Sequence, residues 1–169
     1  QLTATNAEEK NPTLSPDGKY VAYTRDNNLF TYNIAASVER AITDEHTKGV
    51  LNGYASWVYF EEIFGRPTKY RAFWWSPDSK YISFMRFDER NVPMFPIYNS
   101  EGQHGFVEET RYPKAGDPNP TVKIGWTSPE GGAITWADFN DQEDQYFGWP
   151  IWNPNNNTMW LSWMDRGQN

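Results

Sequence analysis

Residues 73–87, FWWSPDSKYISFMRF, join two aromatic segments through a short polar one. Pro77 presets the backbone angle at the second position of a turn, and the Asp78 side chain can bond nearby backbone amides. The flanking Trp, Tyr, Ile and Phe residues are typical of β-strands. The stretch therefore predicts a strand end, a tight turn and a second strand over residues 81–87.

The same pattern occurs three times, at Ser15, Ser76 and Asn153, so successive copies begin 61 and 77 residues apart. Residues 20–34 predict a hairpin after the first copy, and residues 158–163 predict a strand after the third. One propeller blade takes ~40–50 residues, so each interval would hold a blade plus an insertion. The sequence therefore predicts an all-β fold, a partial β-propeller of a few consecutive four-stranded antiparallel meanders. A β-sandwich with similar hairpins is the alternative.

The bulk composition limits the classes of protein and partner. The 169 residues suffice for one domain, and we treat residues 1–169 as a single partial domain, because the chain begins at Gln1 rather than Met. A formal net charge of −7 and a pI of about 4.8 argue against nucleic acid or an anionic membrane as partner. The absence of cysteine excludes disulfides, zinc–thiolate sites and thiol catalysis.

The first predicted insertion, residues 49–69, contains two adjacent carboxylates, Glu61 and Glu62, among aromatic residues. Burying a carboxylate is costly unless a cation or hydrogen-bond donors compensate. Residues 57–64 lack strand alternation and predict a short helical turn, on which neighbouring side chains diverge by only ~100°. Both acids could then meet one cation, which could be an arginine of the chain or a ligand.

The second predicted insertion, residues 99–121, is rich in Gly and Pro and has few aliphatic residues. Long loops in compact domains are usually functional or disordered, so we expect an extended arm that packs on another surface. The acidic run at residues 141–144 lacks the glycine and the terminal Glu of a calcium loop. We interpret this run as a solvated loop tip.

Motifs for catalysis are absent from the sequence. It contains no Gly-x-Ser-x-Gly, no His-Glu-x-x-His and no phosphate-binding Gly-rich loop. The two histidines, His46 and His104, are not grouped with acids, and isolated surface histidines are common. We therefore predict no catalytic residue, no metal site and no cofactor in this chain, which would bind and orient a substrate rather than convert it.

Five segments resemble the N-terminal propeller of the dipeptidyl peptidase IV family. They are WVYFEEIF (57–64), FWWSPD (73–78), VP (92–93), YPKAG (112–116) and NPTVK (119–123). Their order and spacing fit the family from about Asn11 to the end of the chain. The chain is thus similar to a fragment of that propeller, and we expect a bacterial parent protein.

The resemblance implies a serine exopeptidase that removes dipeptides from peptide N-termini, with Pro or Ala preferred at the second position. It also implies an eight-bladed propeller and an α/β-hydrolase domain beyond Asn169, which would carry the Ser, Asp and His of catalysis, so this fragment alone would be inactive. The parent is expected to form a homodimer through the 99–121 arm, and to be periplasmic, exposed at the cell surface or secreted. The alternative is a non-catalytic propeller that acts as an interaction scaffold or belongs to an inactive homologue. A Gly-x-Ser-x-Gly motif after Asn169 would discriminate between the two.

The double-Glu motif of the family maps onto Glu61 and Glu62, which would bind the α-ammonium group of a peptide substrate with a free N-terminus. Phe60 departs from the family, because many members carry a third acid there, but the pair itself is intact. The related prolyl tripeptidyl peptidases keep one acid in this region, so the pair favours release of dipeptides.

The aromatic residues have a structural interpretation. We expect Trp57, Tyr59 and Phe64 to pack the helical turn rather than to contact substrate. The tryptophans expected in the blade cores are Trp74, Trp75, Trp152 and Trp160. An aromatic face that binds carbohydrate is the functional alternative.

Overall fold

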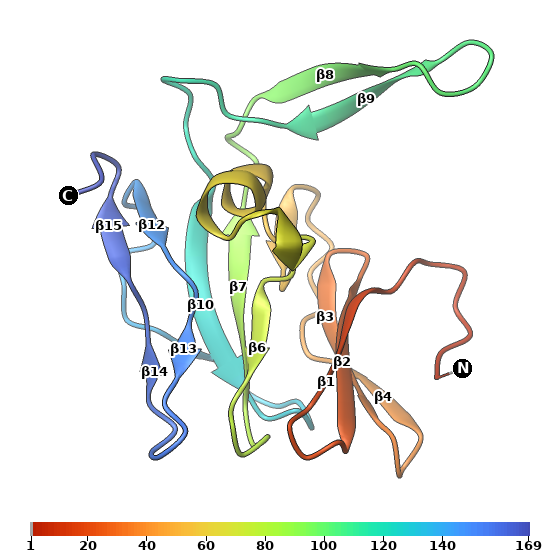
Figure 1. Cartoon of the computed structure of the whole chain (residues 1–169), viewed down its shortest axis with the longest axis vertical. Coiled ribbons are helices and arrows are strands. Elements are labelled where there is room, and N and C mark those ends of the chain that lie inside the picture. The colour runs from red at the N-terminus through yellow and green to blue at the C-terminus, as the bar shows by residue number, and fades with distance from the viewer. Residues whose placement is uncertain (1) are drawn as a thin grey trace.

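A computed structural model describes residues 2–169, and nearly all its regular structure is antiparallel β-sheet (Figure 1). The strands are β1 (Lys10–Leu14), β2 (Tyr20–Arg25), β3 (Asn28–Asn33), β4 (Val38–Ala41), β5 (Val50–Asn52), β6 (Phe73–Trp75), β7 (Ile82–Asp88), β8 (Met94–Asn99), β9 (Phe106–Arg111), β10 (Thr121–Thr127), β11 (Thr135–Trp136), β12 (Gln145–Phe147), β13 (Ile151–Trp152), β14 (Met159–Trp160) and β15 (Trp163–Asp165). Two short helices, η1 (Tyr59–Ile63) and η2 (Arg66–Thr68), lie between β5 and β6. Among residues 2–169, no helix is long and apolar enough to span a membrane.

The first blade is the meander β1-β2-β3-β4. The predicted hairpin is confirmed, since β2 pairs with β3 from Tyr20 opposite Asn33 to Arg25 opposite Asn28. The two residues at its tip, Asp26 and Asn27, both have positive φ, at 49° and 61°. A two-residue turn with this backbone matches the right-handed twist of the strands it joins.

The second blade is built on β7, which pairs with β10 on one side and with both β5 and β6 on the other. Strands β5 and β6 together form one sheet edge, and the segment between them leaves the sheet. The predicted first insertion spans residues 49–69, whereas the structure places Val50–Asn52 in β5 and returns the chain to the sheet at β6.

The third part of the chain is a ribbon in which β12 pairs with β15 and β13 with β14. The strand predicted over residues 158–163 is interrupted between β14 and β15. Trp160 is 60% exposed, so its predicted place in a blade core is wrong, whereas Trp74, Trp75 and Trp152 are partly buried.

The side chains of β7 alternate between two cores, as expected of a strand covered on both faces. Ile82 and Phe84 pack in a cluster with Leu29 of the first blade. Met85 and Phe87 pack in a larger cluster that includes aromatic residues of the insertion and of β12. Strand β7 therefore joins the first blade to the insertion and to the third part of the chain.

The predicted turns of the first two copies have the same pattern of hydrogen bonds. The Ser15 hydroxyl donates to Asp17 across 2.8 Å, and the Ser76 hydroxyl donates to Asp78 across 2.8 Å. In both turns, the amide two residues further along donates to the same carboxylate across 3.1 Å. The repeat seen in the sequence is thus a repeat in three dimensions.

Each later copy also contacts the blade before it through a tryptophan. The Trp75 indole donates to a backbone carbonyl of β1 across 3.2 Å, and the Trp152 indole donates to Ser83 Oγ across 3.1 Å. The ring of Trp75 lies 6.2 Å from that of Tyr20, and the ring of Trp152 lies 6.4 Å from that of Tyr81. Each of these tryptophans therefore contacts the preceding blade through one indole hydrogen bond and one tyrosine ring, although the acceptors of the two hydrogen bonds differ.

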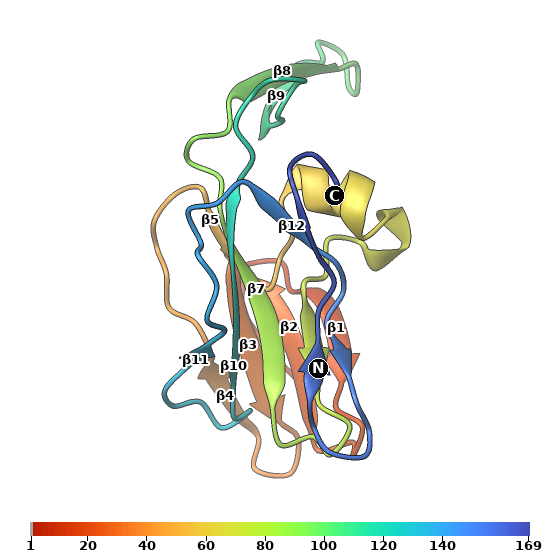
Figure 2. The same ribbon diagram turned by 90° about the vertical axis from the view of Figure 1, so that its left-hand side faces the viewer.

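A hairpin formed by β8 and β9 projects from the second blade between β7 and β10 (Figure 2). It corresponds to the predicted arm, but its first strand begins at Met94 rather than near Asn99. Hairpin and helices extend from the same end of the second blade (Figure 1).

Three backbone hydrogen bonds close the sheet where the helical insertion leaves it. Gly53 N–H donates to Met85 O, Met85 N–H donates to Ala72 O, and Ala72 N–H donates to Gly53 O, each across 2.9 Å. Gly53 has a φ of 71°, and a Cβ there would lie 3.3 Å from atoms of Leu29 and Thr24. This position therefore requires glycine for its backbone angle and for its close neighbours.

We expect Gly53→Ala to lower the free energy of unfolding by ~1–3 kcal/mol, because a left-handed backbone disfavours a Cβ and the neighbours crowd it. The matched control is Gly102→Ala, since Gly102 has a φ of 77° but no atom within 4 Å of the added Cβ. Urea unfolding of both variants in the full-length protein measures the difference. An equal loss in both variants would show that the crowding has no effect.

The Asp17 turn makes stability depend on pH. Hydrogen bonds from the Ser15 hydroxyl and from the Lys19 amide lower the pKa of Asp17 to about 2. Because the folded state binds this proton more weakly than the unfolded chain does, the stabilisation is complete above pH ~4 and is lost as the pH falls towards 2. Asp17→Asn should flatten the dependence of the unfolding midpoint on pH between 4 and 2. A variant with the slope of the wild type would contradict this.

Candidate functional site

The two adjacent glutamates lie on a helical turn, as predicted. Helix η1 closes with a hydrogen bond of 2.7 Å from Phe64 N–H to Tyr59 O, across five residues. This spacing is that of a π-helix, a wide turn often found at functional sites. Glu61 and Glu62 both lie within it.

Tyr59 fixes the turn to the body of the protein. Its side chain is fully buried, and its hydroxyl accepts a hydrogen bond of 3.1 Å from the Phe147 amide. Its ring lies 5.4 Å from that of Phe64 and 4.8 Å from that of Phe87, both in edge-on geometry. Burial raises the pKa of Tyr59 well above its usual value. The predicted packing role of Tyr59 and Phe64 is confirmed.

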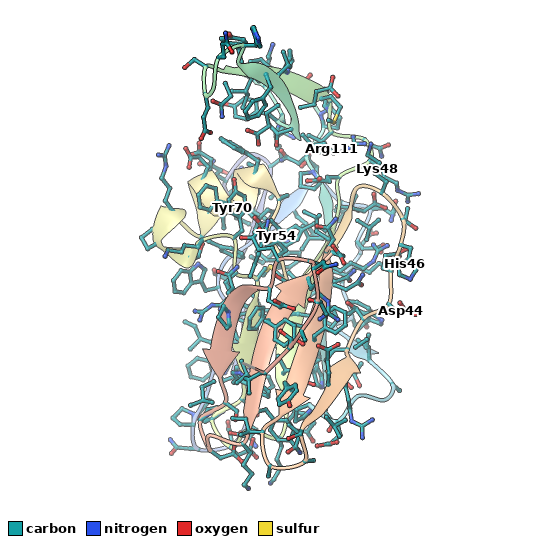
Figure 3. The ribbon with its side chains drawn as sticks, turned by 90° about the vertical axis from the view of Figure 1, so that its right-hand side faces the viewer. Asp44, His46, Lys48, Tyr54, Tyr70 and Arg111 are labelled. Carbon is teal, nitrogen blue, oxygen red and sulfur yellow. The ribbon has the colours of Figure 1, made fainter. Side chains whose placement is uncertain are left out.

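Phe60, next to the acid pair, lies in an aromatic stack. Its ring is 3.8 Å from that of Tyr70, and the ring of Tyr70 is 4.9 Å from that of Tyr54. Figure 3 labels Tyr54 and Tyr70, which lie near each other. The interplanar angles are 13° and 5°, so the three rings are nearly parallel. Burial, the largest cause, raises the pKa of Tyr70 to about 12. The stack therefore gives the turn a second set of packing contacts, besides those of Tyr59.

Trp57 connects the turn to the foot of the β8–β9 hairpin. Its ring lies 5.7 Å from Tyr112 and 6.3 Å from Phe60. Tyr112 also lies 5.5 Å from Phe95 of β8. The helical turn and the arm are therefore in contact through aromatic rings.

Glu61 already has a cation from the chain. Its side chain is 19% exposed, and Arg66 binds it with two donors: Nε contacts Oε2 across 2.8 Å, and Nη2 contacts Oε1. Hydrogen bonding to Glu61 raises the pKa of Arg66, which keeps the guanidinium charged. The sequence left open whether an arginine or a ligand faces the acids, and for Glu61 the structure shows an arginine.

Glu62 differs from its neighbour because it is exposed. Within residues 2–169, its carboxylate has no hydrogen bond and no ion pair. The helical turn thus carries one carboxylate that is bound by an arginine and, on the next residue, one exposed carboxylate. Such an arrangement can bind a group with a positive charge and several N–H donors.

Within residues 2–169, the two histidines form no site with other candidate groups. The expectation that neither histidine is grouped with an acid is wrong for His46, which lies 3.0 Å from Asp44, although both side chains are more than 80% exposed. His104 lies in the exposed loop between β8 and β9. In the described part of the chain, no three His, Cys, Asp or Glu residues are grouped as metal ligands would be.

Arg66 was not among the site residues predicted from the sequence. The signal in the sequence was Gly65-Arg66-Pro67 directly after the helical turn, since Gly and Pro are the residues that most often mark a turn. Gly65 has a φ of 78° and a ψ of 151°, a backbone conformation almost restricted to glycine. This reversal returns Arg66 towards Glu61.

Comparison with known proteins identifies relatives. Residues 1–169 match the family described as the dipeptidyl peptidase IV (DPP IV) N-terminal region. The "probable dipeptidyl-aminopeptidase B" of Arthroderma gypseum is 41% identical over 133 residues, which are 72% of this chain and 14% of that protein. The protein of the same name from Talaromyces stipitatus is 42% identical over 122 residues, which are 65% of this chain and 13% of that protein. The chain thus spans about one seventh of the length of these relatives.

Solved structures share the fold. Dipeptidyl peptidase 4 of Porphyromonas gingivalis superposes with a TM-score of 0.86 at 29% identity, over 99% of this chain and 24% of that chain. A putative dipeptidyl aminopeptidase IV of Bacteroides ovatus gives a TM-score of 0.75 at 29% identity, over 95% of this chain and 21% of that chain. A bacterial source stays a prediction, because the curated relatives named above are fungal. The match over the whole chain and the shared propeller fold show that the chain belongs to the dipeptidyl peptidase IV N-terminal region family.

Proposed function

We propose that this chain is the substrate-recognition propeller of a serine-type dipeptidyl peptidase, in which Glu61 and Glu62 bind the α-ammonium group of the substrate. The observation that carries the proposal is the pair of adjacent carboxylates on a rigid helical turn, with Glu62 exposed and without a partner in residues 2–169. The names of the relatives, dipeptidyl-aminopeptidases, support the same class of reaction.

A free N-terminus fits the chemistry of this site. The α-ammonium group carries three N–H donors and is charged over much of the neutral range. Carboxylate acceptors form charge-assisted hydrogen bonds with it, which are stronger than bonds between neutral groups. A peptide with a blocked N-terminus lacks this charge and would be rejected.

Anchoring the amine also selects the bond that is cut. Two extended residues span at most ~7 Å, so a fixed amine places the second peptide bond at a fixed distance from the anchor. A hydrolase domain of the same protein would supply the nucleophile at that distance, and holding the reacting groups in place contributes to the rate. The proposed preference for Pro or Ala at the second position would be set outside the acid pair.

We expect Glu61→Gln and Glu62→Gln, each in the full-length enzyme, to lower kcat/KM for a Xaa-Pro-p-nitroanilide by about 10- to 100-fold, since each removes a charged hydrogen bond. Steady-state kinetics measures this loss. An N-acetylated substrate should react poorly with the wild type and no worse with the variants.

The matched control is Glu143→Gln, which changes an exposed acid of the 141–144 loop and should leave kcat/KM unchanged. Wild-type kcat/KM in Glu61→Gln or Glu62→Gln would overturn the anchoring role. A wild-type protein without peptidase activity would instead favour the non-catalytic scaffold.

We further propose that the β8–β9 hairpin joins two copies of the parent protein in a homodimer. Its strands carry Met94, Tyr98, Phe106 and Val107, all with large exposed apolar side chains. The hairpin projects from the blade, so these side chains are available to another chain (Figure 2). Exposed apolar residues gathered on one element are typical of an interaction surface.

The double variant Phe106→Glu/Val107→Glu should shift the full-length protein from dimer to monomer, because it places charges in the proposed interface. Sedimentation velocity measures the mass. The control is Val38→Glu, which changes an exposed apolar residue of β4 in the first blade. An unchanged mass in the arm variant would contradict the proposal.

A further inference from the structure

We propose that Arg66 is a positioning residue of the amine-binding site: its guanidinium orients the Glu61 carboxylate so that Glu61 and Glu62 together accept one ammonium group. The inference rests on the proposed function of the two glutamates. It adds a third side chain to the site and assigns that side chain an indirect role.

The contact between Arg66 and Glu61 fixes an orientation as well as a distance. Two donors of the planar guanidinium bind the two oxygens of one carboxylate, with 2.8 Å between Nε and Oε2. A two-point contact of this kind restricts rotation of the carboxylate, which a single point charge does not. Glu61 is mostly buried and Arg66 is 75% exposed, so the arginine reaches the acid from the solvent side.

The backbone beneath Arg66 is itself held in place. After the reversal at Gly65, helix η2 forms with hydrogen bonds from Thr68 Oγ1 to Gly65 O, at 2.8 Å, and from Lys69 N–H to Arg66 O, at 3.0 Å. The Asn11 side chain donates to Lys69 O across 2.9 Å and so ties this segment to β1. Arg66 is thus presented by an ordered turn, although its side chain is exposed.

The acceptor sites of the pair suffice for both partners. A carboxylate offers about four lone-pair positions, and Arg66 uses two of those on Glu61. The other two, together with those of Glu62, remain for the three donors of an ammonium group. Arg66 therefore orients Glu61 without occupying all of its acceptor capacity.

The charges of the three side chains are also compatible with one bound ammonium group. The side chains of Glu61, Glu62 and Arg66 carry a net charge of minus one, which one ammonium group neutralises. Without Arg66, two adjacent carboxylates would repel each other, and Glu61 would be free to rotate. The loss of the cation would also strengthen the attraction for the amine, but water and salt screen an exposed charge strongly. We therefore expect orientation to outweigh charge.

The test uses Arg66→Met and Arg66→Lys in the full-length enzyme, with steady-state kinetics on a Xaa-Pro-p-nitroanilide. Both variants should raise KM about 3- to 10-fold and change kcat less than about twofold, since both lose the two-point contact. The lysine variant keeps the charge, so a KM equal to that of the wild type in Arg66→Lys would overturn the orientation role. An unchanged or lowered KM in Arg66→Met would overturn it as well.

Arg66→Met is then combined with Glu61→Gln in one double variant and with Glu62→Gln in another. Because Arg66 acts through Glu61, Arg66→Met should have no further effect on kcat/KM in Glu61→Gln and its full effect in Glu62→Gln. An equal effect in both backgrounds would show that Arg66 does not act through Glu61. Arg40→Met is the matched control, since Arg40 forms an exposed ion pair with Glu130 away from η1, and it should leave KM unchanged.

The outcomes separate this inference from the proposed function. If Glu61→Gln and Glu62→Gln lower kcat/KM but the Arg66 variants do not, only the inference falls. If the glutamate variants themselves keep wild-type kcat/KM, the amine-binding function falls. Unfolding temperatures within about 2 °C of wild type exclude a loss of folding as the cause of a raised KM.

Discussion

The insertion with the two glutamates depends on one residue of the neighbouring strand, Met85. Its amide and carbonyl bind Ala72 and Gly53, which also bind each other, so all six backbone groups at the junction are paired. An interrupted sheet edge would otherwise leave buried donors and acceptors without partners. Because the ends of the insertion meet at one point of β7, everything between them is held relative to the second blade.

Tertiary contacts, rather than helix propensity, stabilise the helical turn. Isolated helices shorter than ~12 residues are marginal in water, and η1 is much shorter than that. Tyr59 connects the turn to β12 through the hydrogen bond with the Phe147 amide. Phe60 connects it to Tyr70 and Tyr54 through stacked rings. The aromatic residues of this region therefore stabilise a helical turn that would not form in isolation, and this turn carries Glu61 and Glu62.

Much of the fold could be predicted from the sequence, because its signals are local. The turns at Ser15 and Ser76 follow from Pro and Asp at fixed positions, and the helical turn follows from lost alternation. The pairing of Arg66 with Glu61 requires the backbone angles at Gly65, which composition does not reveal. The exposure of Trp160 was missed because side-chain type indicates burial only on average, and the ribbon that carries it has just two strands.

The tryptophan contacts between successive copies have a thermodynamic consequence. Trp75 binds the first blade and Trp152 binds the second, so each later unit packs against the unit that precedes it in the chain. Stability in such an array is a sum of intrinsic and nearest-neighbour terms, as in a one-dimensional lattice. A substitution that removes one of these contacts would then destabilise the two units it joins before the third. The second blade has a neighbour on each side, so its stability depends on both contacts. The same blade bears the acid pair and the arm.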